Sequence, residues 1–280
     1  MLSDQDLKEK SAEYRRTILR IIKQARAGHT GGDLSSIDIL NVLYNHTLHV
    51  SPETFRDPNR DRYVQSKGHC VEALYTVLAD RGFFPVEELD TLGKYQSHFI
   101  GHPTRSVPGI EQNTGALGHG LAVAVGMAIA AKLDGRSYRV FTLLGDGELG
   151  EGSNWEASMA ASHYHLDNLV VIVDRNGLQI TGSTEKVNPL EPLADKFVAF
   201  GYALREVDGN DTRALVELFD QLPFEPGKPN LVLAHTVKGK GVSFIENSHK
   251  WHHKVPSDEE YDTALHELGL HLNYEIDEGR

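Results

Sequence analysis

The stretch YRVFTLLGDGELGEGSNWEASMAASH, residues 138–163, decides the expected fold. It opens with an apolar run over 138–144, turns at a segment rich in glycine and acidic residues (145–152), and continues with a helical pattern to about His163. A short apolar run bounded by glycine is typical of a buried strand, and the polar turn is typical of a strand that leads into a helix. The stretch therefore predicts one strand–helix unit of an α/β fold.

The same alternation of strands and helices extends along the rest of the chain. Further strands are expected over 169–173, 202–207 and 231–234, and helices over 1–25, 37–46, 71–80, 85–92, 121–133, 193–200, 212–222 and 258–268. This order predicts an α/β fold with a doubly wound parallel sheet that carries helices on both faces. Because no segment resembles a linker, we expect a single domain over 1–280, with a helical segment at its N-terminus and a surface helix at its C-terminus.

Composition excludes several classes of protein. The chain has 40 acidic and 28 basic residues and a formal net charge of −12, which argues against nucleic-acid and anionic-membrane partners. Its one cysteine, Cys70, excludes an intrachain disulfide and a four-cysteine zinc site. No apolar run approaches the roughly 18 residues of a membrane helix, and the first ten residues are charged. These features predict a soluble, cytoplasmic protein.

Polar residues follow two neighbouring strands of the expected sheet. Asp146 comes directly after the strand over 138–144, and Asn176 follows the next strand along the chain. A strand–helix–strand crossover brings the ends of parallel strands to one edge of the sheet, so we expect the two side chains to converge. A carboxylate, an amide oxygen and the carbonyl of Leu178 suit Mg²⁺, while Gly147 lets the backbone approach a phosphate. The pattern favours a metal–diphosphate site.

A dinucleotide-binding site is the competing interpretation. The glycine spacing over 145–150 matches the dinucleotide fingerprint, and Asp174 ends the next strand where a ribose-binding acid is expected. However, three acidic side chains would compete with a bare pyrophosphate at the helix N-terminus: Asp146, Glu148 and Glu151. A divalent cation removes this conflict, so an NAD-dependent dehydrogenase is the less favoured alternative.

Six segments resemble transketolase, specifically its N-terminal half, which binds thiamine diphosphate. They occur in the same order as in that family, between about Gly28 and His252. The segments are Gly28-His29-Thr30-Gly31-Gly32, Ser66-Lys67-Gly68-His69, Gly101-His102-Pro103, Thr114-Gly115-Ala116-Leu117-Gly118, Gly145-Asp146-Gly147 with the later Asn176, and Lys238-Gly239-Lys240-Gly241. Each is weak evidence alone, but six in order are strong evidence.

The resemblance implies a role for particular residues. Those that would hold a divalent metal (Mg²⁺, or Ca²⁺ or Mn²⁺) are Asp146, Asn176 and, through its carbonyl, Leu178. Those that would contact the diphosphate are Gly147 and His69, and those that would line the coenzyme rings are Gly115 and Leu117. The residues that would face the ketose are His29, His102 and His252, and those at the subunit interface near the partner's coenzyme are Glu151 and Glu156. The chain departs from the family at His119, usually glutamine, and at His253, usually glycine.

The resemblance also implies an activity. It predicts the transfer of a two-carbon ketol (glycolaldehyde) unit from a ketose phosphate to an aldose, with thiamine diphosphate as the coenzyme. The coenzyme carries the organic step, and the protein orients the reactants and handles protons. Neutral imidazoles both donate and accept hydrogen bonds, so histidines suit proton transfer on and off sugar hydroxyls.

A full-length transketolase is more than twice as long as this chain. Its second domain binds the aminopyrimidine and supplies the glutamate that activates the coenzyme, and no candidate for that glutamate occurs here. We therefore predict the N-terminal subunit of a split transketolase. A C-terminal subunit would supply the activating glutamate, and a heterotetramer with two coenzymes is expected because the site forms between chains.

Two further alternatives remain at this point. The α subunit of a thiamine-diphosphate 2-oxo acid dehydrogenase shares the Gly-Asp-Gly and asparagine pattern, although the histidines at 29, 69 and 102 favour a sugar substrate. A regulatory subunit without chemistry would not need the pair Asp146 and Asn176. Lys238 is interpreted either as a phosphate contact or as part of a basic surface turn.

Overall fold

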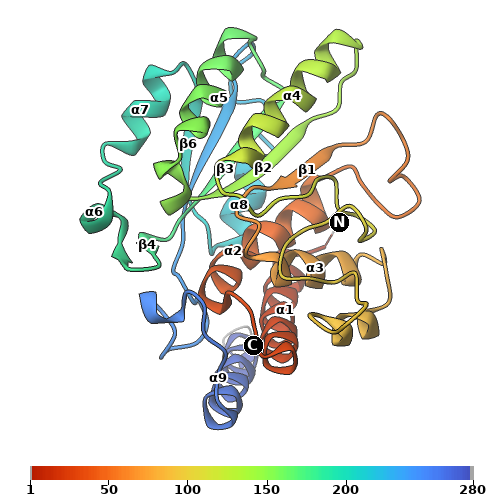
Figure 1. Cartoon of the computed structure of the whole chain (residues 1–280), viewed down its shortest axis with the longest axis vertical. Helices are drawn as coiled ribbons and strands as arrows, with labels where there is room; N and C mark the ends of the chain where they lie inside the picture. Colours follow the sequence, from red (N-terminus) through yellow and green to blue (C-terminus); the bar gives the residue numbers. More distant parts are fainter. Residues whose placement is uncertain (1, 278–280) are drawn as a thin grey trace.

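The computed structural model describes residues 2–277. A five-stranded sheet, in the order β1-β2-β3-β7-β6, forms its centre (Figure 1). The strands are β1 (Arg62–Gln65), β2 (Val140–Gly145), β3 (Leu169–Arg175), β6 (Ala203–Asp208) and β7 (Asn230–His235). Every neighbouring pair in this sheet is parallel. The expected α/β fold is confirmed.

Helices cover both faces of the sheet. The helices of one face are α1 (Asp4–Ala25), α2 (Thr30–Val42), α3 (Val71–Asp80) and α8 (Thr212–Phe219), and those of the other are α4 (His119–Leu133), α5 (Gly152–His163) and α7 (Leu193–Ala199). In β3, Ile172 faces the first layer, whereas Val171 and Val173 face the second. Since successive strand side chains point to opposite faces, burial on both sides explains the continuous apolar run over 169–173.

The second helix differs from its prediction. The pattern predicted residues 37–46, but α2 begins at Thr30 and continues into a π-helical turn over Leu43–Thr47. Its first turns carry glycines and short polar side chains, which have low helix propensity in isolation. All the residues of α2 are buried, and the Ser36 hydroxyl donates to the Gly32 carbonyl at 2.8 Å. Tertiary packing therefore outweighs the local preference.

Several short elements were not predicted. β1 is a four-residue edge strand that begins with the charged Arg62, so it lacks an apolar pattern. A two-stranded antiparallel hairpin, β4 (Leu178–Gln179) with β5 (Gly182–Ser183), precedes the one-turn helix α6 (Thr184–Val187). The segment predicted as a helix over 85–92 is a 3₁₀ helix over Val86–Thr91.

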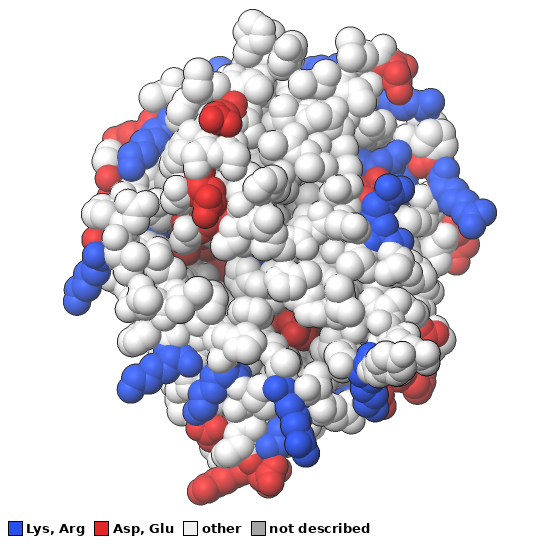
Figure 2. Space-filling view, in the orientation of Figure 1, with Lys and Arg blue, Asp and Glu red and all other residues white. Residues whose placement is uncertain are grey.

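The C-terminal helix is longer than predicted and is partly packed. The helix α9 (Asp258–Asp277) lies against α1 and buries Ala264 and Leu268, so it is a surface helix with one covered side. On the face shown in Figure 2, most charged side chains lie toward the edges and the centre is largely uncharged. Within residues 2–277, no helix has the length and apolar character needed to span a bilayer.

Replacing Ile172 by alanine tests the packing between β3 and the first helical layer. Ile172 is fully buried, so Ile172→Ala is expected to lower the free energy of unfolding by about 2–5 kcal/mol. Leu133 is 82% exposed, and the matched change Leu133→Ala should stay within about 0.5 kcal/mol. Chemical denaturation measures both values, and equal losses would contradict the assignment of the core.

Candidate functional site

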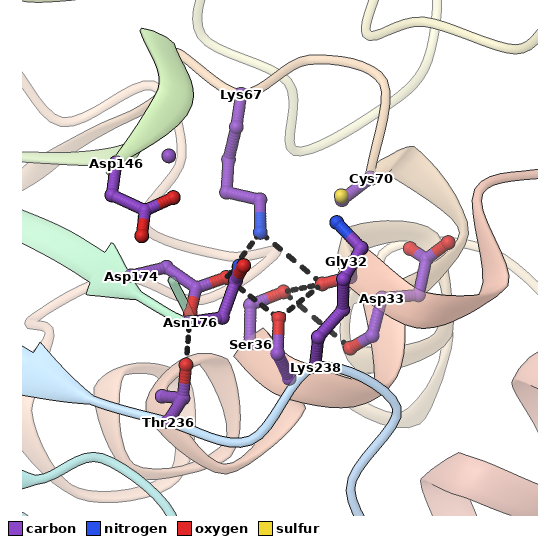
Figure 3. Close-up of polar contacts among 12 residues, drawn as sticks. Gly32, Asp33, Ser36, Lys67, Cys70, Asp146, Asp174, Asn176, Thr236 and Lys238 are labelled. Carbon is purple, nitrogen blue, oxygen red and sulfur yellow. Dashed lines mark hydrogen bonds and ion pairs between the residues drawn. The ribbon is translucent and has the colours of Figure 1, made fainter. Parts of the chain in front are cut away.

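β2 and β3 bring the two expected metal ligands to one edge of the sheet. Gly145 is in register with Asp174, so Asp146 and Asn176 both follow the paired strand ends (Figure 3). Asp146 Oδ2 accepts a hydrogen bond from the backbone N–H of Gly177 at 2.6 Å. The convergence of Asp146 and Asn176, predicted from the parallel crossover, is therefore present in the structure.

A cavity of about 280 Å³ opens beside this pair. Nine of the residues singled out from the sequence line it: His29, His69, Gly115, Leu117, Asp146, Gly147, Asn176, Leu178 and His252. The other lining residues are Lys67, Gly145, Glu148, Gln179, Ile180 and Lys238. Oxygen ligands thus occupy one part of the cavity, and imidazoles another.

His102 and Glu151 lie outside the residues that line the cavity. His102 is exposed and packs against Gly115, which has a φ of +145°; a Cβ there would lie 2.7 Å from the His102 ring. Only glycine allows that approach. Glu151 is exposed and packs against Gly118, and Glu156 is also exposed. His102 and Glu151 therefore border the site through its glycine-rich segment.

The carboxylate of Asp174 connects four segments of the chain. It is fully buried and forms an ion pair with Lys67, which follows β1. Ser35 of α2 donates to Asp174 Oδ2 at 2.7 Å, Asn176 Nδ2 donates to the same oxygen at 3.3 Å, and Thr236 donates to Oδ1. Burial alone would raise the pKa of Asp174, but Lys67 and these donors hold it below its usual range.

Two lysines of the cavity had no clear role in the sequence. Lys67 and Lys238 are 1% and 2% exposed, so the alternative of a basic surface turn is wrong for Lys238. Lys238 Nζ lies 3.2 Å from His252 Nδ1, and burial, followed by the charge of Lys67, lowers the pKa of Lys238. Both lysines belong to segments that resemble transketolase. Lys67 is paired with Asp174, so Lys238 is the lysine of the two whose charge suits an anionic group such as a diphosphate.

Glu148 is another buried residue that the sequence did not assign. Its carboxylate accepts hydrogen bonds from the backbone N–H groups of Gly118 at 2.8 Å and Gly145 at 3.0 Å, and from the Ser66 hydroxyl. Burial raises its pKa, although these donors oppose the shift. Glu148 thereby joins the ends of β1 and β2 to the beginning of α4.

The donor set at Asp146 and Asn176 fits a hard divalent cation. Asp146 accepts from Gly147 and Gly177, and its Oδ2 also forms an ion pair with Arg175 at 3.0 Å. A carboxylate has about four lone-pair sites, so one remains for a metal. Residues 2–277 contain no group of three His, Cys, Asp or Glu that could hold a metal ion. A metal here would therefore need phosphate or water oxygens, as is typical of Mg²⁺.

Three histidines line the cavity, and the exposed His253 packs against one of them. The His29 ring lies 5.0 Å from the ring of His69, 5.5 Å from that of His252 and 4.6 Å from that of His253. Burial, with the charge of His253 second, lowers the pKa of His29 to about 4, and burial with Lys238 lowers that of His252 to about 3. Burial also lowers the pKa of His69. His29, His69 and His252 are therefore neutral at physiological pH, and each can both donate and accept a hydrogen bond.

Comparison with known families agrees with this geometry. The family described as "Transketolase, thiamine diphosphate binding domain" matches residues 8–278. The chain belongs to this family, so the resemblance drawn from six short segments is confirmed, and it is part of a transketolase, a transferase. The 2-oxo acid dehydrogenase and NAD-dependent dehydrogenase alternatives are not favoured.

Similar proteins include some that are named as transketolase subunits. The chain is 50% identical over 262 residues to an apulose-4-phosphate transketolase subunit of Phocaeicola vulgatus, covering 94% of this chain and 93% of that protein. It is 40% identical to "6-deoxy-6-sulfo-D-fructose transketolase subunit SqwG" of a Clostridium species, covering 94% and 96%. It is 38% identical to human transketolase, covering 89% of this chain but only 40% of that protein.

Solved transketolase structures share the fold. The chain superposes on the enzyme of Campylobacter jejuni with a TM-score of 0.86 at 33% identity, covering 94% of this chain. A transketolase variant of Pichia stipitis gives a TM-score of 0.88 at 29% identity, also covering 94%. The chain spans 43% and 41% of these two longer chains.

The lowered pKa values of the cavity histidines can be checked by NMR. The ring signals of His29 and His252 are expected to show no protonation of the imidazole itself between about pH 5 and about pH 8, because their folded pKa values lie below this window. His29→Gln and His252→Gln assign the two signals, and free histidine serves as the reference. Midpoints near the ordinary value of about 6.5 would contradict the neutral cluster.

Proposed function

We propose that this chain is the diphosphate-binding subunit of a two-subunit transketolase that transfers a two-carbon ketol unit from a ketose phosphate to an aldose. The observation that carries the proposal is the cavity in which Asp146 and Asn176 meet three neutral histidines, in a chain of the transketolase family. The chain covers 93% of a protein that is itself named as a transketolase subunit, but only 40% of human transketolase. This difference in coverage supports the two-subunit form.

In this proposal, the oxygen ligands and Lys238 hold the diphosphate end of the coenzyme. Asp146, Asn176 and the Leu178 carbonyl would bind Mg²⁺, which neutralises the diphosphate and removes its conflict with nearby acidic groups. Gly147 would let the backbone approach a phosphate. Lys238 would add positive charge beside the diphosphate, whereas the charge of Lys67 is balanced by Asp174.

The histidines would form hydrogen bonds at the substrate end. When bound, thiamine diphosphate supplies a nucleophilic carbon that allows the bond between C2 and C3 of a ketose to be cleaved. His29 and His252 are neutral, so each can donate a hydrogen bond to a sugar hydroxyl or accept one from it, while the neutral His69 would contact the diphosphate. His102, at the border of the cavity, would contact the same sugar hydroxyls.

A second chain would complete the site. It would supply the activating glutamate and most of the contacts to the substrate phosphate. The exposed Glu151 and Glu156 would lie at the interface with that chain. Two copies of each chain in a heterotetramer would give two equivalent sites related by symmetry.

Removing the Asp146 carboxylate tests the metal–diphosphate site. Asp146→Ala is expected to abolish the Mg²⁺-dependent part of thiamine diphosphate binding, which titration calorimetry measures. The affinity should fall at least about tenfold, since even residues that only orient a metal ligand cost 10–100-fold. The exposed Asp195 provides the control Asp195→Ala, which should bind as the unaltered chain does.

Unchanged Mg²⁺-dependent binding by Asp146→Ala would contradict the metal site. Tighter binding of a nicotinamide dinucleotide by that variant would instead support the dinucleotide alternative, because Asp146 would then be repelling a bare pyrophosphate.

Reconstitution tests the two-subunit form. The isolated chain, given thiamine diphosphate, Mg²⁺, a ketose phosphate and an aldose, is expected to show no ketol transfer, because the proposal places the activating glutamate on the second chain. Adding a chain with the pyrimidine-binding domain should produce transfer, and light scattering should show a tetramer. Full transfer by the isolated chain would refute the split enzyme, and decarboxylation of pyruvate in place of ketose cleavage would refute the reaction.

A further inference from the structure

Two carboxyl groups lie buried between the helices that begin beside the cavity. Asp33 is in the first turn of α2 and is 0% exposed, and Glu72 is in the first turn of α3 and is 2% exposed. Figure 3 shows Asp33 on the same side of the polar cluster as Cys70. Neither carboxyl forms an ion pair within the described residues.

A hydrogen bond between the two carboxyl groups would require a proton. Asp33 Oδ1 accepts from the backbone N–H of Ala73 at 2.8 Å, which places the Asp33 carboxyl beside the residue that follows Glu72. Asp33 Oδ2 and Glu72 Oε2 find no donor among the described residues. An ionised carboxylate can only accept, so a hydrogen bond between these two groups forms only if one of them is protonated.

The surroundings do not supply a charge that would replace this proton. Lys67 is the cation that acts on Asp33, but it is already paired with Asp174. Burial raises the pKa of the Cys70 thiol, which is therefore neutral. On the side of the first helix, a Cβ on Gly28 would lie 3.1 Å from Glu72 Oε1, so glycine leaves room for the carboxyl.

Burial also favours the protonated forms. It raises the pKa of Asp33 to about 7, and it raises that of Glu72 well above its usual value, with the Asp33 charge as the second cause. An unpaired buried charge costs several kcal/mol, so retaining a proton is the less costly state.

The pair lies one helical turn from two cavity histidines. His29 precedes Asp33 at the beginning of α2, and His69 precedes Glu72 at the beginning of α3, with the two rings 5.0 Å apart. We propose that Asp33 and Glu72 share a proton at neutral pH, and that the resulting hydrogen bond positions His29 and His69 by joining the first turns of α2 and α3. The shared proton does not depend on which reaction the cavity supports, and it can be tested without turnover.

Infrared spectroscopy of the full chain tests the proton directly. At about pH 7 the unaltered protein is expected to show a carboxylic acid C=O band that shifts when its aspartate and glutamate carboxyls are isotope-labelled. Glu72→Gln and Asp33→Asn should both lose it. The exposed Glu87 gives the control Glu87→Gln, which should keep the band.

The pH dependence of stability gives a second measurement. Because the folded pKa is raised, the contribution of the pair to stability is fully present below the unfolded pKa of about 4 and is lost as the pH rises through the folded pKa. Glu72→Gln keeps a donor for Asp33 without a titrating proton. The unfolding equilibrium constant of the unaltered chain, divided by that of Glu72→Gln, is therefore expected to rise by up to about tenfold per pH unit between about pH 5 and 7.

The NMR signals of the histidine rings test the positioning role. The His29 and His69 ring signals should shift together as the pair loses its proton above neutral pH, and they should stay constant in Glu72→Gln. An absent acid band at neutral pH in the unaltered protein would overturn the shared proton, even if neither variant folds. A band without any linked shift of the rings would overturn the positioning role, whereas failed binding of thiamine diphosphate would affect only the proposed function.

Discussion

The buried carboxylate of Asp174 is the interaction on which the arrangement of the cavity depends. It receives Lys67 from the segment after β1, Ser35 from α2, Asn176 from the segment after β3 and Thr236 from the segment after β7. Leaving a buried charge unpaired costs about 3–5 kcal/mol, so these four contacts hold three strand ends and a helix in one place. The cavity forms where these segments meet.

The two ends of the cavity differ in chemistry. Carboxylate and amide oxygens form one end, where a metal and a diphosphate would be held. Neutral imidazoles form the other, where a polar substrate would be hydrogen-bonded, and Lys238 contacts one of them, His252. The carboxyl pair Asp33 and Glu72 supports the imidazole end, because it joins the two helices that begin shortly after His29 and His69. The site is thus assembled from charges that the fold keeps buried and paired.

Local patterns were sufficient for four of the five strands of the sheet and for the convergence of Asp146 and Asn176. Parallel strands meet at one edge, so the positions of Asp146 and Asn176 followed from the strand pattern alone. The burial of charged residues did not follow from local patterns, because it depends on partners that are distant in the sequence. Lys67 and Asp174, for example, are 107 positions apart. For the same reason the burial of Lys238 was not predicted. One interpretation of the sequence placed it in a surface turn, but it is 2% exposed. The early start of α2 was missed because its glycines and serines gain helical structure only through packing.

Crystals of the chain grown with thiamine diphosphate and Mn²⁺ provide the most direct measurement of the central claim. We predict an anomalous-scattering peak within about 2.0–2.6 Å of the side-chain oxygens of both Asp146 and Asn176, with the coenzyme diphosphate beside it. A peak away from these two residues, or a diphosphate bound there without a metal ion, would contradict the account.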